Sequence, residues 1–444
     1  MTEPHVVIIG AGFAGLRAAR ELESAGISCE IVEARDRVGG RAWTDERMGR
    51  AIELGATWVH WFQTHVWQEI TRYQQPLVAS PEPEQVYWNS QDTTHQGTLQ
   101  DLDRTIQPLM AEIFARSEQY FPHPYDPLWI LSEQFDGPAS LREQFLADDQ
   151  ASVLDAVRAS GTFTQEQIDL VDAYWSAGYV GSPHTGSALM AKHWVALSDH
   201  RLRLLDDITL KYKLVNGMKA LYEPMAAELN CPIRLNTPVT AVDHDGHSAR
   251  VTLATGEVRE ASAVIVTVPA GALRTIRFTP ELPETITATI EQGWNTSGAK
   301  IWFKVKDRHK LLAYAPYPAP MACIRSEYFT PEGDTILVGF GPEASAVDLE
   351  STADAQRILD YWRDDLEVVE STGHDWQNDP WSGQAWGTLR TGQFTDAWHH
   401  FERLEPPVVF AGSEFARGWR GVCVDGALES GLTTARKLIT HLGS

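Results

Sequence analysis

The chain has 444 residues, the length of about three average domains or of two large interleaved ones. With 37 Lys and Arg against 60 Asp and Glu, its formal net charge is −23, and so acidic a protein is a poor partner for nucleic acid or for an anionic membrane surface. The hydrophobic content of 43% and the charged content of 22% are those of a globular protein. Its 16 tryptophans favour flat apolar surfaces that attract cations.

The cysteines and the apolar runs restrict the cofactors and the compartment. The cysteines are Cys29, Cys231, Cys323 and Cys423. None lies in a Cys-x-x-Cys or Cys-x-x-His pattern, so a cysteine-based metal site is not expected, and scattered thiols indicate a reducing compartment. Residues 1–4 lead into an apolar run without a signal-peptide pattern, and no apolar run approaches about 18 residues. We therefore expect a cytoplasmic protein with no metal and no membrane partner.

The first 33 residues predict a dinucleotide-binding unit. Residues 5–9 are typical of a buried parallel strand, and a helical pattern then runs to about Gly26. A second strand over 28–32 ends at Glu33, which can accept both ribose hydroxyls. The G-x-G-x-x-G turn between strand and helix contains Gly10, Gly12, Ala14 and Gly15. These glycines allow close approach of a pyrophosphate to the helix N-terminus, but they do not separate NAD from FAD.

Two further motifs narrow the choice of cofactor. Residues 33–44 read EARDRVGGRAWT, and residues 53–60 read ELGATWVH. Both resemble the flavin-dependent amine oxidase family, which includes monoamine, polyamine, nicotine-type and L-amino-acid oxidases, and the resemblance implies FAD. The cofactor-binding residues that it implies here are Ala34, Arg35, Gly39, Gly40, Arg41, Gly55, Ala56, Thr57 and Trp58.

The C-terminal residues are similar to the same family. A strand from Val408 ends at Gly412, and a final helix runs from about Asp425 to Leu442. The resemblance implies that Glu414 lies near the ribityl chain and that this helix, with Val424 and Ala427 in its first turn, directs its N-terminus at the flavin. From the residues alone, an ordinary C-terminal docking helix is the alternative.

The middle of the chain is predicted to alternate between two domains. Residues 76–207 are helix-rich with several proline breaks, while strands are expected over 238–242, 249–253 and 263–269. Val239 matches the family position whose backbone meets the adenine. The expected fold is α/β: a Rossmann-like FAD-binding domain interleaved with a mixed sheet-plus-helices substrate domain. The FAD-binding domain is expected over 1–75, 208–290 and 371–444, and the substrate domain over 76–207 and 291–370.

Lys300 has two interpretations. Residues 299–306 alternate, and the pattern alone places Lys300 and Trp302 on a solvated strand face. By resemblance, the segment GAKIWFKV contains the family lysine that holds a water molecule against flavin N5. On that basis we expect Lys300 to position this water for flavin reoxidation.

A tryptophan-rich segment and the start of the last helix supply the expected substrate cage. The alternative is that these tryptophans pack a loop against a sheet. By resemblance, Trp376 packs beside the isoalloxazine and Trp386 forms one wall of the cage. Cys423 stands where the family often has tyrosine as the second wall, which leaves room for a bulkier amine. Ala385 replaces the cysteine that binds FAD covalently in mammalian monoamine oxidases, so non-covalent FAD is expected.

His60 matches a position that can face the substrate channel in polyamine oxidases, with a structural histidine as the alternative. The activity implied is oxidation of an amine by FAD, with release and hydrolysis of an imine and reoxidation by O2 to H2O2. The alternatives are a flavin dehydrogenase with a protein acceptor, an L-amino-acid or polyamine oxidase, a desaturase or porphyrinogen-type oxidase, and a non-catalytic FAD-binding protein. A homodimer is left open.

Overall fold

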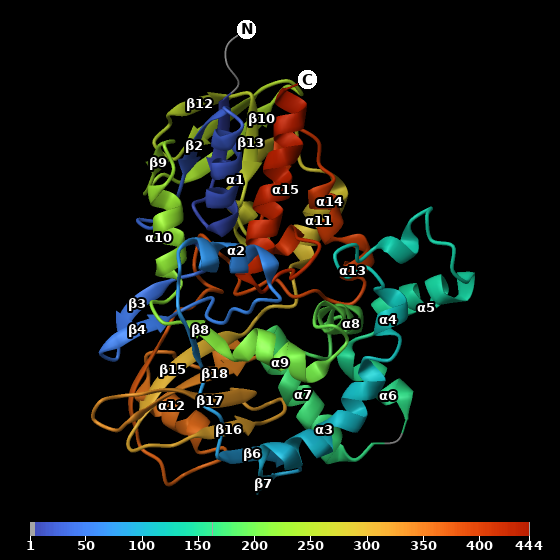
Figure 1. Ribbon diagram of the computed structural model, residues 1–444, viewed down its shortest axis with the longest axis vertical. Helices are drawn as coiled ribbons and strands as arrows, with labels where there is room; N and C mark the ends of the chain where they lie inside the picture. Colours follow the sequence, from blue (N-terminus) through green and yellow to red (C-terminus); the bar gives the residue numbers. More distant parts are fainter. Residues whose placement is uncertain (1–4, 162, 444) are drawn as a thin grey trace.

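The computed structural model describes residues 5–161 and 163–443, and its elements form three main sheets (Figure 1). A parallel five-stranded sheet has the order β20-β13-β1-β2-β9. Its strands are β1 (His5–Ile9), β2 (Ser28–Val32), β9 (Ile233–Arg234), β13 (Ala263–Val266) and β20 (Val408–Phe410). β1 and β13 are apolar on both faces because helices and a second sheet cover them.

Two helices from opposite ends of the chain pack side by side on this sheet, as Figure 1 shows. They are α1 (Phe13–Ser24), which follows β1, and α15 (Val424–Leu442). A Cβ atom on Gly431 would lie 2.3 Å from the carbonyl oxygen of Ala14, so only glycine permits so close an approach. The sequence places both helices correctly, with α15 beginning one residue before the expected start.

A four-stranded sheet of order β12-β11-β10-β14 adjoins the first. Its strands are β10 (Val239–His244), β11 (Ala249–Leu253), β12 (Val258–Ala261) and β14 (Arg277–Thr279). The Asp-Gly and Thr-Gly pairs between β10, β11 and β12 lie in the two hairpin turns, where Gly246 and Gly256 have positive φ angles.

The largest sheet has seven strands in the order β19-β15-β18-β17-β16-β6-β7. Its strands are β6 (Gln85–Ser90), β7 (Thr93–Gly97), β15 (Ala299–Val305), β16 (Leu311–Tyr314), β17 (Cys323–Phe329), β18 (Thr335–Gly341) and β19 (Val368–Gly373). β6 pairs with β16, more than 200 residues away, so two distant parts of the chain build one sheet. The sequence did not predict β6 and β7 within the helix-rich 76–207 region.

A layer of helices packs beside this sheet. They are α3 (Leu99–Ile113), α4 (Ser117–Tyr120), α5 (Ala139–Asp149), α6 (Val153–Ser160), α7 (Gln165–Tyr179), α8 (Ala188–Leu197) and α9 (Leu202–Leu210). α3, α6 and α7 lie at the lower right of Figure 1, and α7 contacts several strands of the sheet. α3, α6 and α7 each begin with a capping box, in which a Ser or Thr hydroxyl and the side chain three residues later satisfy each other's backbone amides. α8 is buried on all sides and forms the centre of this helical layer.

The remaining elements connect these layers. Two short antiparallel two-stranded sheets consist of β3 (Thr44–Arg47) with β4 (Arg50–Glu53) and of β5 (Leu77–Ala79) with β8 (Tyr212–Leu214). The other helices are α2 (Thr64–Arg72), α10 (Lys219–Ala227), α11 (Glu284–Gln292), α12 (Thr352–Leu359), α13 (Gln393–Asp396) and α14 (Trp398–Glu402). The exact domain boundaries stay a prediction.

Two earlier expectations concern the chain as a whole. Among the described residues, no helix is long and apolar enough to cross a membrane, and all four cysteines are free thiols. Residues 1–4, to which the expected absence of a signal peptide refers, lie outside the described residues.

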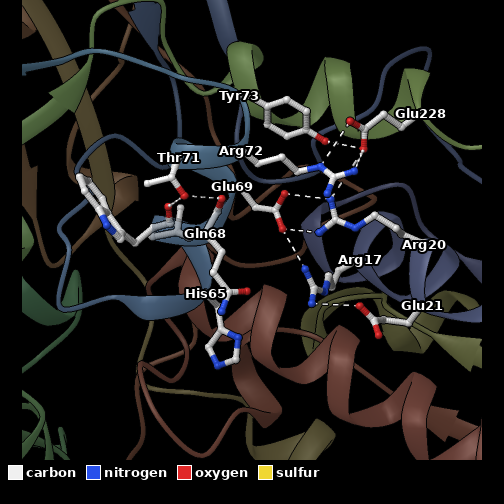
Figure 2. Close-up of polar contacts among 12 residues, drawn as sticks. Arg17, Arg20, Glu21, His65, Gln68, Glu69, Thr71, Arg72, Tyr73 and Glu228 are labelled. Atoms are coloured by element: carbon white, nitrogen blue, oxygen red, sulfur yellow. Dashed lines mark hydrogen bonds and ion pairs between the residues drawn. The ribbon is translucent and has the colours of Figure 1, made fainter. Parts of the chain in front are cut away.

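Helix α2 is fixed to both α1 and α15 by polar contacts. Figure 2 shows Glu69 of α2 directed at Arg17 and Arg20 of α1. Glu69 is 1% exposed; it accepts hydrogen bonds of 2.9 Å from each of these arginines and a further, shorter one from Arg20. At the other end, Asp425 of α15 accepts from the first backbone amides of α2, at 2.7 and 2.9 Å. Through α2, these contacts hold α1 and α15 in place, and the N-termini of α1 and α15 reach the site described below.

We predict that Glu69→Gln lowers the free energy of unfolding by about 2–4 kcal/mol, because two half-buried guanidinium groups lose their shared carboxylate. Chemical denaturation measures this. The matched control is Glu228→Gln, since Glu228 pairs with Arg72 and Tyr73 in the same network but is 36% exposed. That variant should lose no more than about 1 kcal/mol. Equal losses in the two variants would contradict the prediction.

Candidate active site

One cavity extends from the carboxyl ends of β1 and β2 to the seven-stranded sheet. Gly10 and Glu33 line one end, and Tyr314 and Arg325 line the other. Lys300 and Trp386 line it between these ends. The first end lies where open parallel sheets bind ligands, beyond the carboxyl ends of their strands.

The residues at the first end fit the phosphate and ribose groups of FAD. No side chain caps the N-terminus of α1, so its first backbone amides are available to a pyrophosphate. A Cβ atom on Gly40 would lie 3.2 Å from Gly12 Cα, which shows how closely the two glycine loops approach. Glu33 accepts from the backbone amides of Ala11 at 2.7 Å and Arg35 at 2.8 Å, and its remaining lone pairs can accept ribose hydroxyls.

Most residues predicted from the sequence line this one cavity. They are Gly10, Gly12, Ala14, Glu33, Ala34, Arg35, Gly39, Gly40, Arg41, Gly55, Ala56, Thr57, Trp58, Val239, Lys300, Trp376, Trp386, Gly412, Cys423, Val424 and Ala427. Their roles toward a cofactor or substrate are proposals. Gly15, Glu414 and His60 are not among the lining residues.

Gly15 and Glu414 support the lining from behind. A Cβ atom on Gly15 would lie 2.0 Å from the carbonyl oxygen of Gly10, so this glycine permits the helix to pack on the strand. Glu414 is 2% exposed and accepts from Arg41 at 2.7 Å and Trp294 at 2.7 Å. Arg41 also donates to the carbonyl of Ala385 at 2.8 Å, so its guanidinium is held in place at the cavity wall.

His60 lies outside the cavity. Its ring is 1% exposed and stacks on Trp61, with ring centroids 3.8 Å apart. Burial lowers its pKa to about 4, so the ring is neutral near pH 7. Its Nδ1 accepts from the backbone amide of Phe62 at 3.2 Å. The structure therefore favours the structural alternative over a role in the substrate channel.

The alternation pattern gave a wrong environment for Lys300. The face of β15 that carries Lys300 and Trp302 is buried, at 4% and 0% exposure, because β3, β4 and the following loop cover it. Lys300 Nζ donates to the carbonyls of Glu53 and Gly55, 2.8 Å each, and to Thr57 Oγ1 at 2.5 Å. Burial lowers its pKa to about 7, although nearby Glu53 opposes the shift.

The segment after β19 forms one wall of the cavity. Trp376 donates from Nε1 to the carbonyl of Leu54 at 2.9 Å. Asp379 is held by His374, at 2.8 Å, and by two hydrogen bonds of 2.7 and 2.8 Å from Arg35. These contacts with His374 and Arg35 keep the pKa of the Asp379 carboxyl well below its usual range despite burial. Arg35 and Trp376, two residues predicted to contact the flavin, are thus each held by a neighbouring residue, and the Arg35 guanidinium lies 5.7 Å from the centre of the Trp376 ring.

The two expected cage residues both line the cavity. Trp386 packs near Phe340, with ring centroids 6.1 Å apart. Burial raises the pKa of the Cys423 thiol to about 12, so it is a neutral thiol and not a nucleophile near pH 7.

Sequence reasoning missed the far wall. It comes from α7, α8, α9 and the strands β16, β17 and β18. Its residues are Tyr174, Trp175, Trp194, Leu205, Thr209, Leu210, Tyr314, Cys323, Arg325 and Phe340. The signal that could have found part of it is Arg325, a charged residue between the apolar Ile324 and the rest of a strand that reads CIRSEYF.

Comparison with known proteins identifies the family. The model of flavin-containing amine oxidoreductases matches residues 13–439, so the chain belongs to this family of enzymes. Pseudooxynicotine dehydrogenase from a Pseudomonas species is 30% identical, over 98% of this chain and 86% of its own length. Nicotine dehydrogenase from Pseudomonas putida is 27% identical, over 98% of this chain and 88% of its own length. (S)-6-hydroxynicotine oxidase from Paenarthrobacter nicotinovorans is also 27% identical, over 96% of this chain and 96% of its own length.

Solved structures show the same fold. A putrescine oxidase with bound putrescine has a TM-score of 0.80 at 23% identity, over 98% of this chain and 99% of that one. Cyclohexylamine oxidase from Brevibacterium oxydans has a TM-score of 0.76 at 18% identity, over 100% of both chains. The predicted family, its flavin and the amine-oxidase fold are thereby confirmed.

Proposed function

We propose that this enzyme oxidises an amine at the carbon next to nitrogen and that O2 is its electron acceptor. The observation that carries the proposal is Lys300, a buried amine lining the cavity between the dinucleotide end and the aromatic wall. When bound, FAD supplies the acceptor for a hydride equivalent at N5 and passes the electrons to O2, which yields H2O2. The imine product hydrolyses in water.

The chain's own residues would bind the amine and exclude water. Trp386 would flank it on one side, and the neutral Cys423 thiol leaves room on the other. Walls of this kind disfavour the ammonium form by desolvation and favour the neutral amine, whose lone pair assists C–H cleavage. Lys300 would hold a water molecule at the reacting centre by donating a hydrogen bond to it from Nζ, which in this structure donates to Thr57 Oγ1.

Other finer features belong to the same proposal. Ala385 lines the cavity and has no thiol, which supports non-covalent FAD. The free thiols support a reducing, cytoplasmic location. A homodimer stays an open option.

A second candidate is an amine dehydrogenase with a protein acceptor, because two of the relatives above are named dehydrogenases. Measuring H2O2 during aerobic turnover separates the two. One equivalent per amine oxidised supports the oxidase, and absence of peroxide with rapid reduction of an added electron carrier supports the dehydrogenase.

The test of the proposal is an anaerobic flavin-reduction screen of the holoenzyme. Aromatic amines, polyamines, nicotine-like amines and amino acids are mixed with the enzyme, and bleaching of the flavin absorbance is followed. Bleaching by at least one amine class is the expected result. No bleaching by any amine would favour the non-catalytic FAD-binding alternative.

We predict that kcat/KM rises with pH up to the pKa of the substrate amine and then levels off, because the cavity takes the neutral amine. Below that pKa the slope should be about tenfold per pH unit. In steady-state assays with two amines of different pKa, the inflection of the kcat/KM profile should lie at the pKa of each amine. A profile that is flat across both pKa values would rule out selection of the neutral amine.

A further inference from the structure

Arg325 and Lys300 lie on the same face of the seven-stranded sheet. Phe340 of β18 pairs with Lys300 on one side and with Cys323 of β17 on the other. Arg325 pairs with Val338, which lies two residues from Phe340 along β18. Since side chains alternate between faces, Lys300, Phe340, Cys323 and Arg325 share the face toward the cavity, and all four line it.

The guanidinium of Arg325 is only partly neutralised. Its Nε lies 2.8 Å from Glu327 Oε1, and the structure records no partner for Nη1 or Nη2 among the described residues. The Glu327 carboxylate also contacts Lys213 Nζ and accepts from Ser80 at 2.8 Å. One carboxylate therefore serves two cations.

The rest of the cavity supplies no second anion. Among its described lining residues Glu33 is the one acidic side chain, and it lies at the dinucleotide end. Asp206 lies behind Tyr174, from which it accepts a hydrogen bond of 2.6 Å; burial raises the pKa of this carboxyl to about 7, so it offsets Arg325 incompletely. Despite the overall charge of −23, Arg325 is thus the one charged side chain among the described residues that line this end of the cavity.

This inference rests on the proposed amine oxidation. We propose that Arg325 binds an anionic group, a carboxylate, at the end of the substrate remote from the amine that is oxidised. Two free guanidinium nitrogens in an aromatic cavity match the two oxygens of a carboxylate. The same charge repels a second ammonium group, so diamines should be poor substrates.

The sheet geometry separates the two ends of such a substrate. Arg325 and Lys300 lie on strands separated by β18, and their positions along the strands differ by two residues. Their Cα atoms are therefore on the order of 12 Å apart. The carboxylate thus lies several bonds from the reacting carbon. The substrate class is an ω-amino acid or a similar amine with a distal acid, in contrast to an α-amino acid.

A set of three matched amines tests this with the holoenzyme. Hexylamine, 6-aminohexanoate and 1,6-diaminohexane share one chain and differ in the end group, and their N-methyl derivatives extend the test to secondary amines. Anaerobic stopped-flow gives an apparent Kd and a limiting rate of flavin reduction for each. We expect 6-aminohexanoate to bind most tightly and the diamine most weakly.

Arg325→Met should raise the apparent Kd of 6-aminohexanoate by about 10- to 100-fold and change the limiting rate of flavin reduction by it less. The apparent Kd of hexylamine should change little. Arg325→Lys should restore part of the affinity. The matched control is Lys304→Met, which removes a positive charge from the same sheet at a position paired with Glu370. It should leave all three amines unchanged.

The outcomes distinguish failure of carboxylate binding by Arg325 from failure of the proposed amine oxidation. If the three amines bind alike in the unmodified enzyme, or if Arg325→Met weakens hexylamine and 6-aminohexanoate equally, Arg325 does not select an acid while amine oxidation stands. If no amine of any class reduces the flavin, both proposals fall. Should Arg325→Met fail to fold, calorimetric titration of the unmodified holoenzyme with hexanoate and with hexanol decides, since only hexanoate should bind.

Discussion

The Lys300→Met variant will keep its FAD and lose about 100-fold in the rate at which O2 reoxidises the flavin, the usual cost of removing one preorganised donor. Methionine preserves the length and apolar contacts of the side chain between Trp58 and Trp302. It removes the group that donates to Gly55 and Thr57 and that would hold the water molecule. Stopped-flow mixing of the reduced enzyme with O2 measures the rate.

The pH dependence gives a second signature of the same group. Because burial lowers the pKa of Lys300 to about 7, the ammonium dominates below pH 7 and the neutral amine above it. A positive charge stabilises the negative charge that develops on O2, so the rate should fall as the pH rises through about 7. Lys300→Met should lack this inflection. Lys304→Met, on the same strand, is the control, and full activity of Lys300→Met would show that the assignment is wrong.

Glu33→Gln should weaken FAD binding by about 10- to 100-fold, the effect of one lost hydrogen bond to a charged acceptor. The carboxylate serves the amides of Ala11 and Arg35 with its two oxygens. Glutamine has one acceptor oxygen, so one amide loses its partner and the acceptors left for ribose are fewer. Titration of the apoprotein with FAD, followed by fluorescence quenching, gives the Kd.

A control on the same strand separates loss of cofactor from loss of fold. Glu30 of β2 is also buried, but it accepts from Arg259 and does not line the cavity. Glu30→Gln should lower the melting temperature of the apoprotein and leave the Kd for FAD unchanged. If both variants change the Kd equally, the effect is one of stability and Glu33 has no specific role.

Local sequence was sufficient for the dinucleotide end. The glycines between β1 and α1, and the acid at the end of β2, lie within 33 consecutive residues, and their backbone requirements leave one arrangement. The seven-stranded sheet was harder, since β6 pairs with a strand more than 200 residues away. No local pattern carries that information, and β6 and β7 were missed for this reason.

Lys300 and His60 show where residue patterns fail. Alternation correctly put Lys300 and Trp302 on one face of a strand, but whether that face meets water depends on β3 and β4, which are remote in sequence. His60 lies next to the cavity-lining Trp58, yet its ring turns away to stack on Trp61. Family resemblance implied a place at the site for both residues; Lys300 lines the cavity, whereas His60 does not.

By itself, the sequence determined the family, the flavin and the dinucleotide-binding motif, because these depend on contiguous residues with fixed backbone demands. Only the tertiary structure decided which charges meet where the cavity reaches the seven-stranded sheet. Arg325 and Glu327 lie two residues apart on β17, and the side chain of Lys213, from the distant strand β8, packs against the same carboxylate, so the sharing of one carboxylate by two cations is a property of that packing. The overall acidity of the chain gave no sign of it, since a net charge counts residues without placing them.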